Sequence, residues 1–174
     1  MNQTERRLFL IRFLLDENPA YREIGIPSDA AEQRYLLRAL LNVREPQPIR
    51  EEFLRVQDAY LQAETAAKGT TDAADLIPVQ PGIALWQGDI TTLKCDAIVN
   101  AANSGMTGCY IPNHRCIDNA IHTYAGVELR LTCEELMQQQ GYPEPTGKAK
   151  ITPAFNLPCR YVLHTVGPII NGRV

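Results

Sequence analysis

The stretch "GDITTLKCDAIVNAANSGMTG", residues 88–108, decides how the second half of the chain is organised. It contains a short apolar run, 97–101, that is typical of a β-strand, and it follows a similar run at 83–87. Each run leads into a polar segment, "QGDIT" at 87–91 and "VNAANSGMTG" at 99–108. Because α/β sheets bind ligands beyond the carboxyl ends of their strands, both segments are candidate ligand loops.

The residue types in these two loops suit a nucleotide. Asp89 can accept a hydrogen bond from an exocyclic amine, and Asn100 and Asn103 carry donors and acceptors suited to ribose hydroxyls. Gly105 and Gly108 allow backbone amides to approach a phosphate closely. Taken singly, each loop is more often an ordinary turn, and it is their order after two predicted strands that favours a shared ligand.

Helices and strands alternate around these loops. Downstream, the pattern predicts two helices and then two strands, at 114–126, 127–141, 149–155 and 161–166. Such alternation indicates a layered α/β fold. Upstream, three helices are predicted to provide packing, and they begin at Thr4, near Ser28 or Asp29, and after Pro48.

A segment rich in Gly, Pro and small polar residues separates the two parts of the chain. We place the boundary within residues 68–82, "KGTTDAADLIPVQPG". The sequence therefore predicts a helical N-terminal extension over residues 1–75 and an α/β domain over residues 76–174.

Composition excludes several classes of protein. The chain has 174 residues, 45% of them hydrophobic, and a net charge of −3, which favours a globular protein and argues against a general nucleic-acid binder. No stretch approaches the roughly 20 apolar residues of a membrane span. Arg12 interrupts the apolar run 8–15, which therefore indicates an amphipathic helix, not a signal peptide, so we expect a cytoplasmic protein. The five cysteines are odd in number and argue against a disulfide framework.

The segment "GCYIPNHRC", residues 108–116, brings Cys109, His114 and Cys116 close together in sequence. Two thiolates and an imidazole suit Zn²⁺, and three protein ligands leave one coordination position open, as in catalytic zinc sites. Two alternatives remain from spacing alone. The first is two thiols and a surface histidine without metal, and the second is a structural zinc site closed by His122.

The two loops, together with "GKAKITPAFNLPCRYVLHTVGP" at 147–168, resemble the macrodomain family, which binds ADP-ribose. The resemblance implies a three-layer α/β/α sandwich around a mixed sheet. It also implies that Asp89 and the amide of Ile90 bind the adenine, and that Asn100 and Asn103 lie near the distal ribose, with Asn103 positioning it. The remaining residues of the phosphate-side loop would be Ala101, Ala102, Gly105 and Gly108.

The stretch "MTGCYIPNHRCIDNAIHTYAG", residues 106–126, further resembles the zinc-dependent macrodomains of bacteria and fungi, which remove ADP-ribose from proteins. The resemblance implies that Cys109, His114 and Cys116 bind zinc beside the distal ribose and, with Asn103, form the catalytic group. We expect a zinc-dependent hydrolase that cleaves mono-ADP-ribose from an acidic side chain. Zinc would either activate water or polarise the ribose or ester oxygen. A lipoyl-carrier protein modified by a sirtuin is one expected partner. The alternative function is a non-catalytic ADP-ribose reader.

Four further residues have weaker functional signals. His122 and His164 are expected to pack, Asp118 is a candidate to orient His114, and Trp86 is expected in the core. Macrodomains carry a second glycine-rich loop beyond the position of "GPIINGRV", residues 167–174. We therefore expect the chain to build the N-terminal part of the fold, as a piece of a longer chain, as a chain completed by a second one, or as a reduced domain.

Overall fold

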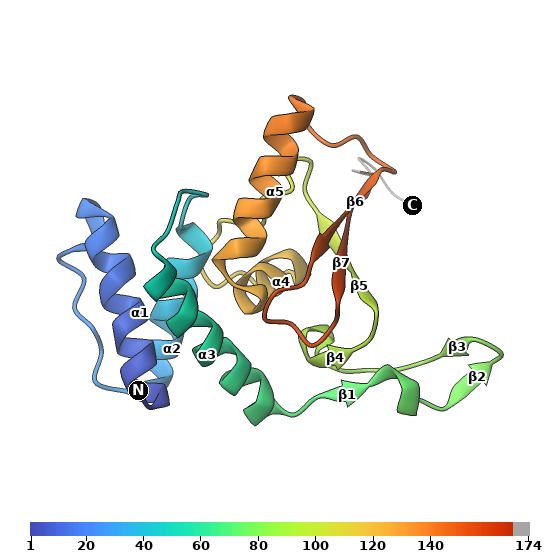
Figure 1. Cartoon of the computed structure of the whole chain (residues 1–174), viewed down its shortest axis with the longest axis horizontal. Coiled ribbons are helices and arrows are strands. Elements are labelled where there is room, and N and C mark those ends of the chain that lie inside the picture. The colour runs from blue at the N-terminus through green and yellow to red at the C-terminus, as the bar shows by residue number, and fades with distance from the viewer. Residues whose placement is uncertain (169–174) are drawn as a thin grey trace, which may run out of the picture.

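The computed structural model describes residues 1–168. Its first part is a bundle of three helices, α1 (Gln3–Glu17), α2 (Ala30–Val43) and α3 (Glu51–Lys68), with a 3-10 turn η1 at Pro19–Tyr21 (Figure 1). The helices pack through an apolar core that includes Leu10, Ile11, Leu37 and Phe53. None of the helices in residues 1–168 combines the length and apolar character needed to cross a bilayer.

The helix starts follow from capping side chains. The Asn2 side chain accepts a hydrogen bond from the Glu5 amide while the Glu5 carboxylate accepts one from the Asn2 amide, so α1 begins with a capping box at Asn2. The expected cap at Thr4 is wrong by two residues. Asp29 caps α2 as expected, because its carboxylate accepts from the amides of Ala31 and Glu32.

A connecting segment leads from the bundle to the main sheet. It holds β1 (Thr71–Asp72), η2 (Ala73–Asp75), β2 (Pro78–Gln80), β3 (Ile83–Ala84), η3 (Ile90–Thr92) and β4 (Leu93–Lys94). Strands β1 and β4 pair in parallel, and β2 and β3 form an antiparallel hairpin that extends away from the other elements (Figure 1).

The strand predicted over 83–87 is mostly wrong. Only Ile83–Ala84 is a strand, it belongs to the hairpin, and Leu85 is 84% exposed. The apolar side chains of this run are not buried against another part of the described structure. Since β3 belongs to the hairpin, the loop at 87–91 does not follow a strand of the main sheet. Trp86 is half-exposed and lies over Gly88, outside the core in which it was expected.

The main sheet has the order β5-β7-β6 and is mixed. Strand β5 (Ala97–Ala102) is parallel to β7 (Tyr161–Val166), and β6 (Ala149–Pro153) is antiparallel to β7. Helices α4 (Ile117–Ala125) and α5 (Val127–Gln140) lie on one side of this sheet (Figure 1). These elements confirm the α/β class. Helix α4 begins three residues later than predicted, because Cys116 is its N-cap.

Strand alternation gives the sheet one buried and one open face. Ile98, Val162 and Val166 point toward α4 and α5 and join a second apolar core, whereas Val99 and Ile151 on the opposite face are 55% and 57% exposed. Within residues 1–168, the sheet therefore has a helical layer on one face only.

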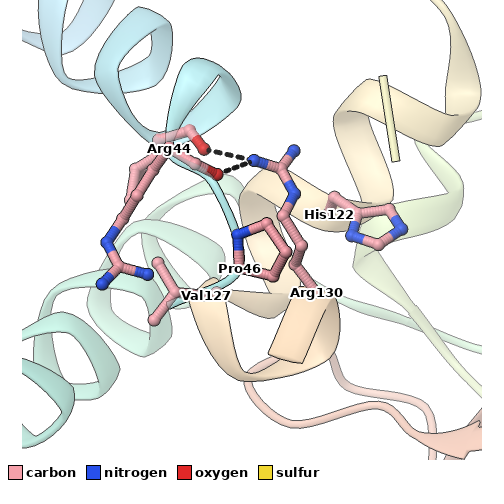
Figure 2. Close-up of a pocket in the computed structure, with 7 residues that line it drawn as sticks. Arg44, Pro46, His122, Val127 and Arg130 are labelled. Carbon is pink, nitrogen blue, oxygen red and sulfur yellow. Dashed lines mark hydrogen bonds between the residues drawn. The ribbon is translucent and has the colours of Figure 1, made fainter. Parts of the chain in front are cut away.

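A buried arginine joins the helical bundle to the sheet layer. Arg130 on α5 donates hydrogen bonds to the carbonyls of Leu41, Asn42 and Arg44 at the end of α2, and its Nε donates to the carbonyl of Thr107. Figure 2 shows the guanidinium of Arg130 directed at the carbonyl of Arg44. Figure 2 also shows that Arg130 and His122 line a narrow cavity beside Arg44. The loop that leads to the candidate metal ligands is thus tied to the bundle through α5.

Candidate functional site

The loop after β5 is organised by the side chain of Asn103. Its Oδ1 accepts hydrogen bonds from the amides of Gly105 at 2.9 Å and Met106 at 3.1 Å, and its Nδ2 donates to the carbonyl of Gly108 at 3.1 Å. These bonds hold a turn in which Met106 has φ 64° although it is buried. Asn103 itself is exposed, so its second amide N–H is available to a ligand.

Gly108 ends this loop at a position where the structure requires glycine. Its φ is +88°, and a Cβ added there would lie 2.8 Å from the ring of His122. Gly105 has no left-handed backbone and is exposed. The expected role of the glycines in phosphate approach thus stays a prediction, while Gly108 has a packing role that sequence reasoning missed.

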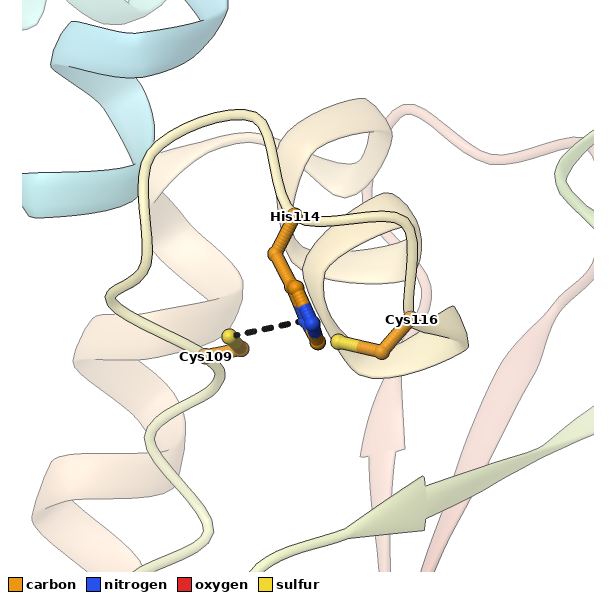
Figure 3. Close-up of side chains that lie close together, drawn as sticks. All are labelled: Cys109, His114 and Cys116. Carbon is orange, nitrogen blue, oxygen red and sulfur yellow. Dashed lines mark hydrogen bonds between the residues drawn. The ribbon is translucent and has the colours of Figure 1, made fainter.

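Cys109, His114 and Cys116 converge in space. Figure 3 shows the three side chains pointing toward one another, Cys109 from the loop and the other two from the segment that enters α4. The Sγ of Cys109 lies 3.6 Å from the Nδ1 of His114, and the ligand atoms of all three residues lie within 4.8 Å of one another. The cysteines are half-buried and the histidine is exposed, so the group opens to solvent.

The thiol environment fits a cation. Burial raises the pKa of Cys116, the Asn119 amide that donates to its Sγ at 3.4 Å opposes this, and the neighbouring Cys109 thiol raises it further. Two adjacent thiols resist ionising together, and a bound divalent cation removes that repulsion. The donor set, two sulfurs and one imidazole nitrogen with an open side, therefore fits Zn²⁺.

Asn100 takes a position different from the expected one near the ribose. Its side chain is 0% exposed, donates to the Asp118 carboxylate at 2.8 Å and lies 3.1 Å from the Nδ1 of His164. Alternation along β5 explains this, since Ile98 and Asn100 point to the helical layer while Ala101 points to the open face. The side chain of Asn100 belongs to a buried network, not to the ligand surface of this structure.

Asp118 also differs from its expected role. It was a candidate to orient His114, but its carboxylate accepts from Asn100 and lies 3.6 Å from the Nε2 of His122. Burial raises the pKa of Asp118, and the hydrogen bond from Asn100 and the charge of Arg130 oppose this. Asp118 is therefore part of the interior beneath the metal loop.

A buried group of His122, Cys133 and His164 lies next to these residues, and sequence reasoning missed it. His122 has 2% of its side chain exposed, and neither of its ring nitrogens has a hydrogen-bond partner. The Nε2 of His164 lies 3.0 Å from Thr152 Oγ1 and 3.9 Å from Cys133 Sγ. His122 therefore packs, as expected, and is not a fourth ligand of the Cys109 group. The sequence signal that could have found this group is periodicity, since each of the three residues falls on the apolar, inward side of its own helix or strand.

Asp89 and Ile90 begin the 3-10 turn η3. One Asp89 oxygen accepts from the amide and hydroxyl of Thr91, and the other pairs with Lys68 of α3 at 3.4 Å. Burial alone would raise the pKa of Asp89, but Thr91 and Lys68 outweigh it and lower the pKa below its usual value. Asp89 is thus an ionised, half-exposed acceptor, as binding of an amine requires.

Comparisons with known proteins agree on one family. The model of the Macro domain matches residues 99–173. A protein-ADP-ribose hydrolase of Treponema medium is 62% identical over 178 residues, covering 100% of this chain and 68% of the relative. One of Staphylococcus aureus strain MRSA252 is 53% identical over 164 residues, covering 94% of this chain and 61% of the relative.

A solved structure supports the same assignment. The crystal structure of a Trypanosoma brucei macrodomain in complex with ADP superposes with a TM-score of 0.53 at 29% identity, covering 75% of this chain and 60% of that chain. This chain thus spans about two thirds or less of the length of the relatives described here. Residues 169–174, with Gly172, lie outside the described residues.

Proposed function

Because the chain belongs to the macrodomain family and is a homologue of protein-ADP-ribose hydrolases, we propose that it is a zinc-dependent hydrolase that releases mono-ADP-ribose from an acidic side chain of a modified protein. One observation carries the zinc requirement. Cys109, His114 and Cys116 converge directly after the Asn103 loop, since Asn103 bonds to the carbonyl of the residue that precedes Cys109.

Separate residues of the proposed site would bind the base, the ribose, the phosphates and the metal. Asp89 accepts a hydrogen bond from the adenine amine, and the Ile90 amide supports the same base. Asn103 fixes its own loop through three hydrogen bonds and offers its remaining N–H to the distal ribose. The backbone of residues 101–108 lines the phosphate side. Cys109, His114 and Cys116 would hold the metal, and this group of side chains opens to solvent, which supplies the water that the hydrolysis consumes.

When bound, zinc supplies Lewis-acid chemistry, either lowering the pKa of a water to roughly 7 or polarising an oxygen of the ribose or ester. The protein contributes a fixed geometry around the cleaved bond between C1″ and the side chain. The position of the ligands beside the ribose loop supports this catalytic role over a purely structural one.

The substrate and compartment are parts of the same proposal. We take the substrate to be a mono-ADP-ribosylated protein, with a lipoyl-carrier protein modified by a sirtuin as the first to be tested. A site that depends on two reduced thiols works in a reducing compartment, which supports a cytoplasmic location.

The test combines metal content with turnover. The chain, purified without chelator, should contain about one zinc per molecule and release ADP-ribose from a glutamate- or aspartate-modified protein, and a chelator should stop the release. Cys116→Ser and His114→Ala should lose zinc and turnover by more than about 100-fold, since a lost ligand exceeds the 10- to 100-fold effect of its neighbours.

The matched control is Cys95→Ser, because Cys95 is a half-buried cysteine that lies outside the ligand group. This variant should keep zinc and turnover. Tight ADP-ribose binding without release would replace the hydrolase with the reader function, and turnover that persists in the metal-free chain would overturn the zinc requirement.

A further inference from the structure

Helix α2 of the N-terminal bundle contacts the loop that carries the metal ligands. The Arg38 guanidinium donates from Nη2 to the carbonyl of His114 at 3.0 Å and to the Oδ1 of Asn119 at 2.9 Å. One turn later, the Oδ1 of Asn42 accepts from the amide of Asn113 at 2.9 Å. Two side chains far from the loop in sequence therefore hold the backbone on either side of the His114 amide.

Asn119 connects this helix to the two cysteines. Its side chain is 0% exposed, and its Nδ2 donates to the carbonyls of Ile111 at 3.1 Å and Cys109 at 3.4 Å. Its backbone amide donates to the Sγ of Cys116 at 3.4 Å. Through one residue and its bond to Arg38, the backbones of Cys109 and His114 and the sulfur of Cys116 are held in one network.

The bonds of Asn42 stabilise a backbone conformation that is unfavourable by itself. Asn113 has φ 55°, in the left-handed region, and its amide is held by the buried Asn42. The Nδ2 of Asn42 donates to Thr123 at 2.9 Å, and Thr123 donates to the carbonyl of Asn119 at 2.7 Å. Asn42 thus contacts both the loop and helix α4, on which Asn119 lies.

We infer that Arg38, Asn42 and Asn119 are positioning residues of the metal centre, so that helix α2 of the N-terminal bundle forms part of the site. The inference rests on the proposed function, because it concerns the same zinc ligands. An eight-residue loop from Cys109 to Cys116 would otherwise lose conformational freedom when the metal binds. Ligands already arranged by hydrogen bonds bind the metal without that loss.

The experiment measures zinc dissociation constants by chelator competition in the chain and its variants. Arg38→Ala and Asn119→Ala should weaken zinc binding by roughly 10- to 100-fold, the usual effect of removing a partner of a metal ligand. Arg38→Lys should recover only part of the loss, since a lysine cannot bond His114 and Asn119 with a planar fork. Asn119→Asp keeps the acceptor for Arg38 but loses both donors and should also weaken binding.

The matched control is Arg34→Ala, an exposed arginine one turn earlier on α2. It should leave zinc affinity unchanged. Thermal unfolding of the metal-free variants separates a structural role from a positioning one. Equal zinc affinity in the parent chain and in folded Arg38→Ala and Asn119→Ala would overturn the inference while leaving the hydrolase proposal intact.

A second readout is the absorption spectrum of the Co²⁺-substituted chain. If Asn119 positions the two thiolates, the thiolate-to-cobalt charge-transfer bands should change in Asn119→Asp and stay unchanged in Arg34→Ala. A parent chain that binds neither Zn²⁺ nor Co²⁺ would overturn this inference together with the zinc requirement of the proposed function. The two failures are thus distinguished by the behaviour of the parent chain.

Discussion

Asn100 on β5 and His164 on β7 occupy paired positions of two parallel strands, and the Nδ2 of Asn100 lies 3.1 Å from the Nδ1 of His164. Because an amide nitrogen is a donor, His164 accepts at Nδ1 and carries its proton on Nε2, which faces Thr152. Asp118 accepts the other hydrogen bond of Asn100. A neutral histidine is thus built into the interior directly beneath the ligand loops.

The stability of the chain should fall as the pH decreases from 6.5 toward 4. Burial lowers the pKa of His164 to about 4, and burial, followed by the charges of Arg130 and His164, also holds the pKa of His122 well below its usual value. The unfolded chain therefore binds these protons first, which destabilises the folded state by on the order of 3 kcal/mol at pH 4 for His164 alone. Above pH 6.5 this contribution to stability is fully present.

Urea unfolding at a series of pH values measures this dependence. The raised pKa of Asp118 acts in the opposite sense and offsets part of the loss, since the folded state gains that proton first. His164→Gln removes one titrating group and should flatten the profile. An unchanged slope in this variant would contradict the assignment to His164.

Gly108→Ala should destabilise the chain by about 3 kcal/mol. The left-handed backbone contributes ~1–2 kcal/mol, and the contact of the new Cβ with His122 contributes ~1–3 kcal/mol. Because Cys109 follows directly, zinc affinity should fall as well. Gly25→Ala is the control, since Gly25 has open space around it and no positive φ. Urea titration and chelator competition on both variants test the prediction. Equal free energies of unfolding for Gly108→Ala and Gly25→Ala would contradict it.

Substitutions of Asn103 should separate loop order from ligand binding. Asn103→Ala removes the acceptor for Gly105 and Met106 and should lower ADP-ribose affinity roughly 10- to 100-fold, as loss of two or three hydrogen bonds implies. Asn103→Asp keeps that acceptor but loses the donor to Gly108. It should lose affinity for ADP-ribose, as calorimetric titration would show, and thermal unfolding of both variants measures how much of the loss follows from a less ordered loop. Parental affinity in both variants would remove Asn103 from the site.

Arg130→Met should lower the free energy of unfolding by about 3 kcal/mol or more. The substitution leaves the carbonyls of Leu41, Asn42, Arg44 and Thr107 without this buried donor. Arg160→Met at an exposed position should change stability by less than about 0.5 kcal/mol. Urea unfolding of the two variants compares a buried arginine with a surface one, and similar values would show that Arg130 does not join the bundle to the sheet layer.

Local sequence patterns predicted correctly those helices and strands whose apolar periodicity runs uninterrupted along the whole element. Strand β7 matches its predicted range 161–166, and α5 differs from its prediction by one residue at its end, where Gly141 is left-handed. The Cys109, His114 and Cys116 group could also be anticipated, because three residues of types that bind zinc fall within one eight-residue segment, and the structure brings their ligand atoms together. The run at 83–87 failed because a short apolar segment becomes a buried strand only where a partner surface exists.

Residue types and their spacing along the chain are sufficient to predict the α/β class, the family and the candidate ligands. The direction in which each side chain points, and the groups that it contacts, follow only from strand register and helix packing. Strand register placed Asn100 against His164 and away from the ligand surface. The packing of α2 against α4 brought Arg38 within 3.0 Å of His114, 76 residues away. Contacts at such separations depend on the assembled fold, so no local pattern encodes them.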